Sequence, residues 1–278
     1  MRVKKSQPRA GKILKIIVSV LLGIIAFLEL GMVKIHTKGA WKPDYEKKDI
    51  SSLITQTKLS DDDYKTLYYQ TGLSRKSLEQ MLADKDYSKI LDIQTAFFTR
   101  FEEQRQIFAP FTCSDRIEGN IPLASLEDGD IIISPSSHFS FLRSGHAAIV
   151  VNAKEGRIIN ATGFGYKSSV EDVSDLSCRP AFIVLRLKEG AEKRSEIARF
   201  SYENLLGIKY RLTAGLFEGD SADEVKSTHC GHLVWYAFNE FAFDLDSNKG
   251  PFVWPKDIAN SEYLEVVQIY GIDPNKRF

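Results

Sequence analysis

The segment from Thr228 to Phe238 constrains the fold more than any other part of the chain. Apolar or small residues at positions 230, 233, 234, 237, 238 and 241 recur at the spacing of one helix face. Ser227 and Thr228 directly precede this pattern and are suitable N-cap residues. The pattern therefore predicts a buried helix that begins at Cys230. A sulfur at a helix N-terminus lies near the positive end of the dipole and near unpaired N–H groups, which favour a thiolate.

Short runs rich in isoleucine and valine predict a sheet upstream of this helix. They cover residues 130–134, 146–152, 157–161 and 181–187. In an antiparallel meander we expect His146, at the start of the second run, and Asn160, in the third, to lie on adjacent strands and share a face. A helix that crosses this face would bring Cys230 beside them as a nucleophile, with a base and an orienting group.

Simpler interpretations of these residues stay open at this stage. A lone cysteine in an apolar helix is usually a packing residue, and a histidine that enters a strand is more often structural than catalytic. His229, Cys230 and His232 also suggest zinc, but Cys230 and His232 point to different sides of a helix. No Cys-x-x-Cys pair and no fourth ligand is evident. We therefore expect no metal and no cofactor.

Several short motifs, taken in order, resemble the permuted NlpC-type papain-like cysteine hydrolases, in particular their YiiX/YebB-like group. The motifs are Asp128–Ile132, Gly145–Val150, Gly207–Tyr210, His229–Trp235 and, as the usual C-terminal segment, Trp254–Ile258. The histidine precedes the cysteine, as in the permuted branch that includes lecithin–retinol acyltransferase-like proteins. The resemblance covers roughly residues 120 to 270. It implies an α+β, circularly permuted papain-like fold whose antiparallel sheet packs against the cysteine helix.

The resemblance also implies roles for four residues. Cys230 is the nucleophile and His146 the general base. Asn160 falls where the group has a polar orienting residue, often an acid; an asparagine can fix the imidazole tautomer but cannot stabilise an imidazolium by charge. Tyr210 matches a position near the active site, where its hydroxyl either donates to an oxyanion or packs a loop.

The N-terminus has the features of a membrane signal. Basic residues precede an apolar run from Ile16 to Leu28, which Glu29 interrupts and Leu30–Val33 continue. Counted through Glu29, the run approaches the roughly 20 residues that span a bilayer. No small-residue cleavage site and no lipobox cysteine follows it. We therefore expect an uncleaved single-pass anchor in the cell membrane, with the body of the protein outside the cytoplasm.

The remaining patterns complete the predicted organisation. It comprises a cytoplasmic basic segment (residues 1–15), a transmembrane anchor (16–33), a polar tether (34–59), a helical lead-in (60–112) and the papain-like cysteine hydrolase domain (113–278). In the lead-in, helix start signals predict helices from Ser60 towards Gln70, from Ser74 through Leu82, and from Tyr87 to Gln106. Further along we expect a loop over 161–180, a helix over 191–206, an acidic loop over 211–226, a short helix over 256–265 and a last strand over 264–270.

Charge and cysteine content exclude some classes of protein. Residues 1–40 contain eight of the 37 basic and one of the 37 acidic side chains, so the rest of the chain carries seven more acids than bases. A mildly acidic body without a basic patch argues against nucleic acid as a partner. Three cysteines are too few for a disulfide framework; Cys113 and Cys178 can pair in an oxidising compartment, but we expect both to be unpaired. His138, a rival base in a predicted loop before the His146 strand, is assigned to the rim of the site or to contact with substrate.

These observations predict a membrane-anchored thiol hydrolase. Through a Cys-His-Asn site and an acyl-enzyme it would cleave an amide bond, and the resemblance favours peptidoglycan stem peptides. One alternative is a lipid ester or amide hydrolase or acyltransferase of the permuted branch. Another is a binding module without catalytic activity. An apolar groove beside Cys230 would favour lipid, and an open acidic cleft would favour peptide.

Overall fold

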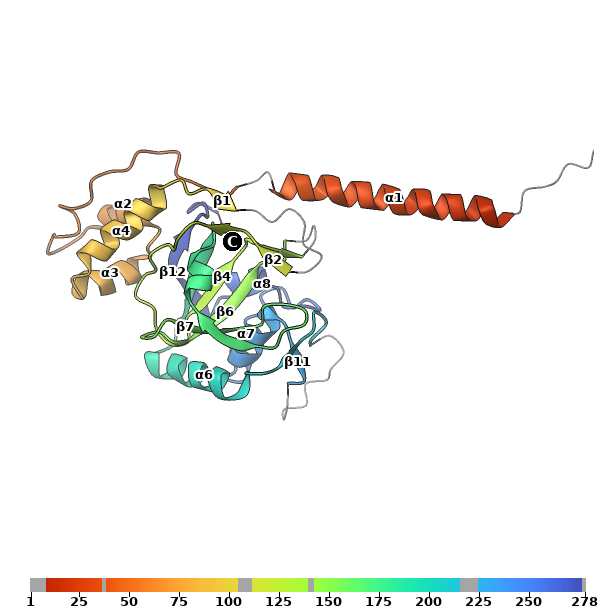
Figure 1. Cartoon of the computed structure of the whole chain (residues 1–278). Coiled ribbons are helices and arrows are strands. Elements are labelled where there is room, and N and C mark those ends of the chain that lie inside the picture. Colours follow the sequence, from red (N-terminus) through yellow and green to blue (C-terminus); the bar gives the residue numbers. More distant parts are fainter. Residues whose placement is uncertain (1–8, 37–38, 105–111, 140–142, 216–224, 277–278) are drawn as a thin grey trace, which may run out of the picture. The chain divides into compact units, whose positions relative to one another are not determined.

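The computed structural model describes residues 9–36, 39–104, 112–139, 143–215 and 225–276. It contains two units, residues Met1–Lys38 and Gly39–Phe278. The first unit holds helix α1 (Arg9–His36). The second holds the strands and the other helices (Figure 1).

A six-stranded antiparallel sheet forms the centre of the second unit. Its strand order is β12 (Leu264–Tyr270), β9 (Phe182–Leu187), β4 (Ile131–Ser134), β6 (His146–Asn152), β7 (Arg157–Asn160) and β8 (Ser169–Asp172). The isoleucine- and valine-rich runs form the four inner strands, because both faces of those strands are buried. β8 and the short helix α5 (Ser174–Ser177) lie where the sequence predicts a loop, since residues 169–172 pair with β7 along its whole length.

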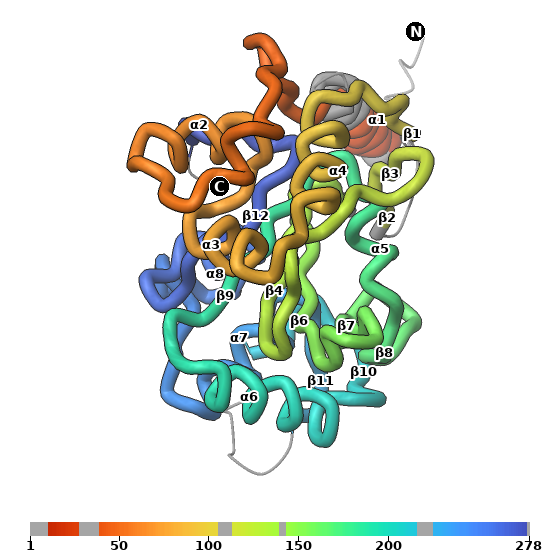
Figure 2. Tube along the Cα trace, turned by 90° about the vertical axis from the view of Figure 1, so that its left-hand side faces the viewer, coloured from red at the N-terminus to blue at the C-terminus, as the bar shows by residue number. Residues whose placement is uncertain are grey.

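Three helices cover the part of the sheet that carries the candidate site. α7 (Cys230–Asn239) and α6 (Ala191–Asn204) both pack against β6, and α8 (Pro255–Ala259) packs against α7 and β4. α6 ends two residues before the predicted position. α8 ends well before residue 265, because the chain must turn at Asn260–Tyr263 to enter β12. Figures 1 and 2 show α6 and α7 together at the end of the sheet away from α2–α4.

The lead-in forms three helices, α2 (Asp61–Thr71), α3 (Arg75–Ala83) and α4 (Tyr87–Phe98). Ser60 and Asp63 make a capping box at the start of α2, and Gly72 ends it with φ 73°. Ser74 caps α3. α4 is shorter than predicted, because Thr99 is extended and the chain then enters β1 (Glu103–Gln104), which pairs with β3 (Arg116–Ile117). An isolated bridge between Leu73 and Gln268 joins the lead-in to β12.

Residues 40–56 pack against the body instead of forming a polar tether. The backbone N–H of Trp41 donates to the carbonyl of Gly271 at 3.0 Å, and Ile50 and Ile54 are buried in the main core. The apolar side chains at 50, 53 and 54 recur at the spacing of one helical turn. This short pattern gives too weak a signal to separate a packed segment from a linker.

Helix α1 corrects the prediction for the N-terminus. Among the residues that the structure describes, no helix is long and apolar enough to cross a membrane. Charged residues lie within α1 on both sides of the apolar run, and the run from Ile16 to Leu28 is shorter than the roughly 20 residues required. This finding contradicts the predicted transmembrane anchor over 16–33 and the single-pass membrane localisation derived from it.

A buried ion cluster connects the lead-in to the sheet. Arg186 on β9 donates from Nε to Asp130 Oδ1 at 2.8 Å and from Nη2 to Asp130 Oδ2 at 2.8 Å. Its Nη1 donates to Glu127 Oε1 at 2.6 Å and to Gln80 Oε1 of α3 at 3.2 Å. Burial raises the pKa of Asp130, and the charge and hydrogen bonds of Arg186 oppose that shift. The carboxylate therefore depends on Arg186 to stay ionised.

We expect Arg186→Met to lower the free energy of unfolding by about 3–5 kcal/mol, because it leaves the Asp130 carboxylate buried without its partner. Urea denaturation at neutral pH measures the change. Lys76→Met is the matched control. Lys76 of α3 also links the lead-in to the sheet, through a pair with Glu265 of β12, but this pair is exposed. Its loss should stay below about 1 kcal/mol. Equal losses for the two variants would contradict this account of the cluster.

Candidate active site

Cys230 is the first residue of α7, as predicted. The N-cap is His229 and not Ser227 or Thr228, which form β11 (Ser227–Thr228) instead. The ring Nδ1 of His229 accepts a hydrogen bond from the backbone N–H of His232 at 3.3 Å. Gly231 is required at the second position, because a Cβ there would lie 2.1 Å from the carbonyl oxygen of Val253. The close approach lets the segment that leads to Trp254 and Pro255 line the site.

His146 begins β6, opposite Ser134 of β4. Gly145 precedes it with φ 68°, and the Gly145 N–H donates to the carbonyl of Ser137 at 3.0 Å. His146 and Cys230 line the same small cavity, together with His229, Tyr210 and Trp254. Hydrogen bonding from the N–H of Ala147, next to His146, also lowers the pKa of the Cys230 thiol. The structure therefore brings the predicted nucleophile and base to one site.

Burial keeps both groups neutral in the resting protein. Burial raises the pKa of the Cys230 thiol to about 11, although hydrogen bonds from the N–H groups of Ala147, Gly231 and Cys230 act in the opposite direction and lower it. Burial and the nearby positive charge of Arg179 lower the pKa of His146 to about 3. The sequence left open whether an ion pair is preformed. These pKa values indicate a neutral thiol beside a neutral imidazole.

Asn160 lies on the same face of the sheet as His146. It pairs with Ala148, and residues 146 and 148 of β6 project to the same side. Its Nδ2 donates to Glu171 Oε2 at 3.1 Å, whereas its buried Oδ1 has no hydrogen-bond partner among the described residues. The bond from the His146 ring to Asn160 is thus not formed in this structure, although its acceptor is buried and unused.

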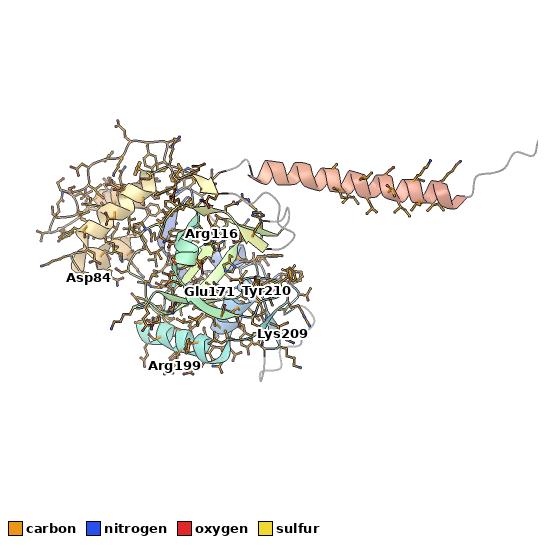
Figure 3. The ribbon with its side chains drawn as sticks, viewed as in Figure 1. Asp84, Arg116, Glu171, Arg199, Lys209 and Tyr210 are labelled. Atoms are coloured by element: carbon orange, nitrogen blue, oxygen red, sulfur yellow. The ribbon has the colours of Figure 1, made fainter. Side chains whose placement is uncertain are left out.

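Glu171 of β8 is a component of the site that the sequence did not reveal (Figure 3). It accepts from both Asn160 Nδ2 and, at 3.0 Å, Ser169 Oγ, so it fixes which way the amide of Asn160 points. Ser169 pairs with Asn160, and Glu171 projects to the same side two residues later. The alternation of polar side chains at 169 and 171 was the available signal, but the surrounding glycine- and serine-rich segment predicted a loop.

Tyr210 also lies at the cavity. It ends β10 (Lys209–Tyr210), which pairs in parallel with β11. Tyr210 is therefore opposite Thr228, which precedes Cys230 by two residues. Its ring makes an edge contact with Phe164 at a centroid distance of 5.1 Å. Tyr166, predicted at the rim, is exposed, and its carbonyl accepts from the Tyr210 N–H at 3.1 Å.

His229 is the second component that the sequence did not assign to this site. Burial lowers the pKa of His229 to about 3, so the ring is neutral. Its Nδ1 accepts the cap hydrogen bond and is therefore unprotonated, which places the ring proton on Nε2. That Nε2 is buried and has no hydrogen-bond partner among the described residues. An unused N–H thus belongs to a residue that lines the cavity beside Cys230.

A wider polar groove adjoins the cavity, with Ser144 and Trp254 lining both. Its other lining residues are Arg143, Ser247, Asn248, Lys256, Asp257 and Asn260. The carboxylate of Asp257 already accepts from the Trp254 N–H at 2.9 Å and from Asn248 Nδ2 at 2.5 Å. Arg143 and Lys256 are exposed. Most of the lining residues are therefore polar, and the exposed charges among them, Arg143 and Lys256, are positive.

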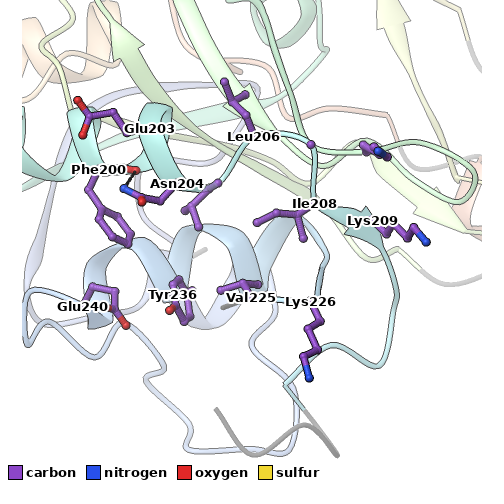
Figure 4. Close-up of a pocket in the computed structure, with 13 residues that line it drawn as sticks. Phe200, Glu203, Asn204, Leu206, Ile208, Lys209, Val225, Lys226, Tyr236 and Glu240 are labelled. Atoms are coloured by element: carbon purple, nitrogen blue, oxygen red, sulfur yellow. Dashed lines mark hydrogen bonds between the residues drawn. The ribbon is translucent and has the colours of Figure 1, made fainter. Parts of the chain in front are cut away.

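Another hollow lies away from this chemistry (Figure 4). It is lined by the C-terminal end of α6, by β10 and by Tyr236 and Glu240 of α7. Neither Cys230 nor His146 lines it. Its lysines and glutamates give it no nucleophile, so the smaller cavity is the better candidate site.

Two further predictions concern the histidines and possible metal ligands. His138 is not at the rim of the site, because it is buried in β5 (Ser137–Phe139), which pairs with β2 (Thr112–Ser114). In the part of the chain that the structure describes, no group of three or more His, Cys, Asp or Glu side chains is arranged to hold a metal ion. The predicted acidic loop over 211–226 lies partly outside the described residues.

No family model, no curated protein and no solved structure matches this chain. The resemblance read from the motifs therefore stays a prediction.

The two buried neutral histidines should make the protein acid-sensitive. Because the pKa values of His146 and His229 are about 3 in the folded state against an ordinary value of 6.5, only the unfolded chain binds these protons between those pH values. Their contribution is fully present above pH 6.5 and is lost as pH falls towards 3. We expect each to contribute a slope of about 1.4 kcal/mol per pH unit.

His229→Asn isolates one of the two histidines, since asparagine is a good N-cap. Urea denaturation at intervals between pH 4 and 5.5 should give a slope smaller by about 1.4 kcal/mol per pH unit in the variant. An unchanged slope would mean that His229 is already protonated, or exposed, in the folded protein.

Proposed function

We propose that this protein is a thiol hydrolase that cleaves an amide bond through an acyl-enzyme on Cys230. The observation that supports it is the cavity in which the Cys230 sulfur, at a helix N-terminus, adjoins His146 and unused hydrogen-bonding groups. A packing cysteine needs none of these neighbours. Nucleophile, base and orienting group from three distant segments match the arrangement that activates a thiol.

The neutral resting pair makes His146 a general base in the chemical step. As the sulfur attacks the carbonyl carbon, His146 accepts the thiol proton. It then gives that proton to the departing amine as the C–N bond breaks. Water, deprotonated by His146, attacks the thioester, the acid leaves and the proton returns to the sulfur.

Asn160 and Glu171 assist the charged form of His146. A bond from the imidazolium to Asn160 Oδ1 would raise the pKa of His146, because hydrogen bonding to a charged form favours it. Glu171 holds the Asn160 amide through its Nδ2. Glu171 thereby supplies, through Asn160, the negative charge that Asn160 itself lacks.

The oxyanion of the tetrahedral intermediate meets three donors in this proposal. They are the backbone N–H of Cys230, the Nε2–H of His229 and the hydroxyl of Tyr210. His229 is the strongest new candidate, because its donor is buried and unused in the resting protein. A buried donor aimed at developing charge needs no reorganisation during the reaction.

The groove favours a peptide over a lipid as substrate. Its polar lining and its exposed cations, Arg143 and Lys256, suit a peptide that carries carboxylates. Peptidoglycan stem peptides combine amide bonds with free carboxylates, so they are the substrate class we propose, with the choice of this class resting on the motif resemblance.

Digestion of purified muropeptides by the full chain tests the proposal. We expect new peptide products, resolved by chromatography and mass spectrometry, with the wild type. Cys230→Ala should lower the rate by at least about 10³-fold, and His146→Gln should do the same. Cys178→Ala is the matched control, because Cys178 is another buried free cysteine that does not line the cavity.

Each outcome of this assay has a distinct meaning. Equal product release by the wild type and Cys230→Ala would refute cysteine catalysis. Cleavage of a fatty-acyl ester, with muropeptides untouched, would support the lipid alternative. No turnover of either substrate together with no alkylation of Cys230 would favour a binding module.

The role of His229 has its own test. His229→Ser keeps an N-cap hydroxyl and removes the ring donor, and we expect kcat to fall about 10²–10³-fold with KM little changed. His229→Asn keeps both a cap and an N–H donor and should retain more activity. Loss of kcat in both variants in proportion to lost thermal stability would point to a purely structural role.

A further inference from the structure

A second cysteine, histidine and carboxylate meet outside the cavity of Cys230. Cys113 of β2 lies directly opposite His138 of β5 in the antiparallel pair. Directly paired residues project to the same side, and Asp115 projects there too, two residues after Cys113. The N–H of Asp115 donates to the carbonyl of Ser136 at 3.0 Å, which fixes the backbone next to this strand pair.

The three side chains are in contact and almost fully buried. Cys113 Sγ lies 3.3 Å from His138 Nδ1 and 3.2 Å from Nε2, so the sulfur rests against the imidazole ring rather than in line with one N–H. Asp115 Oδ1 lies 3.6 Å from His138 Nε2. The exposed fractions are 7% for Cys113, 1% for His138 and 2% for Asp115. Buried polar side chains at such distances are energetically coupled.

The environment of His138 is opposite to that of His146. The nearby Asp115 carboxylate, followed by the Cys113 sulfur, raises the pKa of His138 to about 9, so the ring is an imidazolium at neutral pH. Arg143 Nη2 also faces Asp115, at 3.5 Å from Oδ2. Arg179 donates to Ser137 Oγ at 3.0 Å on the neighbouring residue of β5.

The charged side chains near the Cys113 sulfur are mostly cations. Among the described residues the cluster combines one carboxylate, Asp115, with the cations His138 and Arg143, and Arg179 adds further positive potential. Arg116 and Asp175 form a separate pair, at 3.4 Å. The Cys113 sulfur therefore lies beside an imidazolium in surroundings that hold further cations. A thiolate beside an imidazolium is the arrangement that makes cysteines reactive.

We propose that Cys113, His138 and Asp115 form a second reactive thiol site, independent of Cys230, whose substrate class is small hydroperoxides. The Cys113 thiolate attacks one peroxide oxygen, and the O–O bond breaks. Sulfur is oxidised by two electrons to a sulfenic acid, and the other oxygen accepts the His138 proton and leaves as water, or as an alcohol when the hydroperoxide is organic. With hydrogen peroxide, thiolate, imidazolium and peroxide give sulfenic acid, imidazole and one water.

The burial of Cys113 restricts its reaction partners to small molecules. A protein thiol or a large disulfide cannot approach a sulfur that is 7% exposed, whereas hydrogen peroxide is the size of two water molecules. Cys178 is an internal comparison for this argument. It is 9% exposed, and its sulfur accepts from Arg116 Nη1 at 3.4 Å but has no histidine against it.

The experiment uses the full chain carrying Cys230→Ala, so that its result does not depend on the proposed hydrolase chemistry. Hydrogen peroxide with dimedone, and separately iodoacetamide, are followed by peptide mass spectrometry at Cys113 and Cys178. We expect Cys113 to react at least about tenfold faster than Cys178 at pH 7. We also expect this rate advantage to shrink above pH 9, where His138 loses its proton.

Two variants complete the test. His138→Gln should remove the rate advantage of Cys113, and Asp115→Asn should reduce it, with Cys178 unchanged in both. Since a buried substitution can unfold the region, the pH profile of the parent chain decides the matter by itself. Equal rates at the two cysteines at pH 7, a rate advantage of Cys113 that is unchanged above pH 9, or no dimedone adduct there would each overturn the proposal.

Discussion

The contact between α7 and β6 is the constraint on which the candidate site depends. It brings the first residue of the helix to the first residues of the central strand, so that the N–H of Ala147 bonds towards the Cys230 sulfur. Leu233, Val234, Ala237 and Phe238 bury the rest of the helix in the core. Burial of four such side chains is worth several kcal/mol, which is enough to hold a polar sulfur and an imidazole in a place where neither is well solvated.

The same fold gives its histidines different protonation states. His146 and His229 have no carboxylate hydrogen-bond partner among the described residues. Burial lowers both pKa values to about 3, assisted by the positive charge of Arg179 at His146 and by His232 at His229. His138 is buried as deeply, but Asp115 and Cys113 raise its pKa to about 9. Burial therefore does not decide the charge of a histidine; the partner that is buried with it does. The two cysteine sites differ for this reason, one resting as a neutral pair and the other carrying an imidazolium.

Local sequence signals predicted the elements well where the signal itself is local. Ser60 with Asp63, Ser74 and Gly72 mark helix ends because capping needs only neighbouring residues. The isoleucine- and valine-rich runs form the inner strands, and this composition is also a local signal. The prediction was wrong where the outcome depends on length or on distant contacts: the N-terminal apolar run is too short to span a membrane, and residues 40–56 pack because Gly271 and the core lie beside them.

The sequence by itself determined that Cys230 begins a buried helix and that His146 and Asn160 share a face of the sheet, because helical and strand periodicities are properties of the chain alone. Only the tertiary structure decided the rest of the site. Glu171 and His229 became part of it through strand pairing and a cap hydrogen bond. Cys113 and His138, 25 residues apart, met through the pairing of β2 with β5. The physical reason is that charge, burial and hydrogen-bond partners belong to a position in space, and the chain order does not specify which positions will be neighbours.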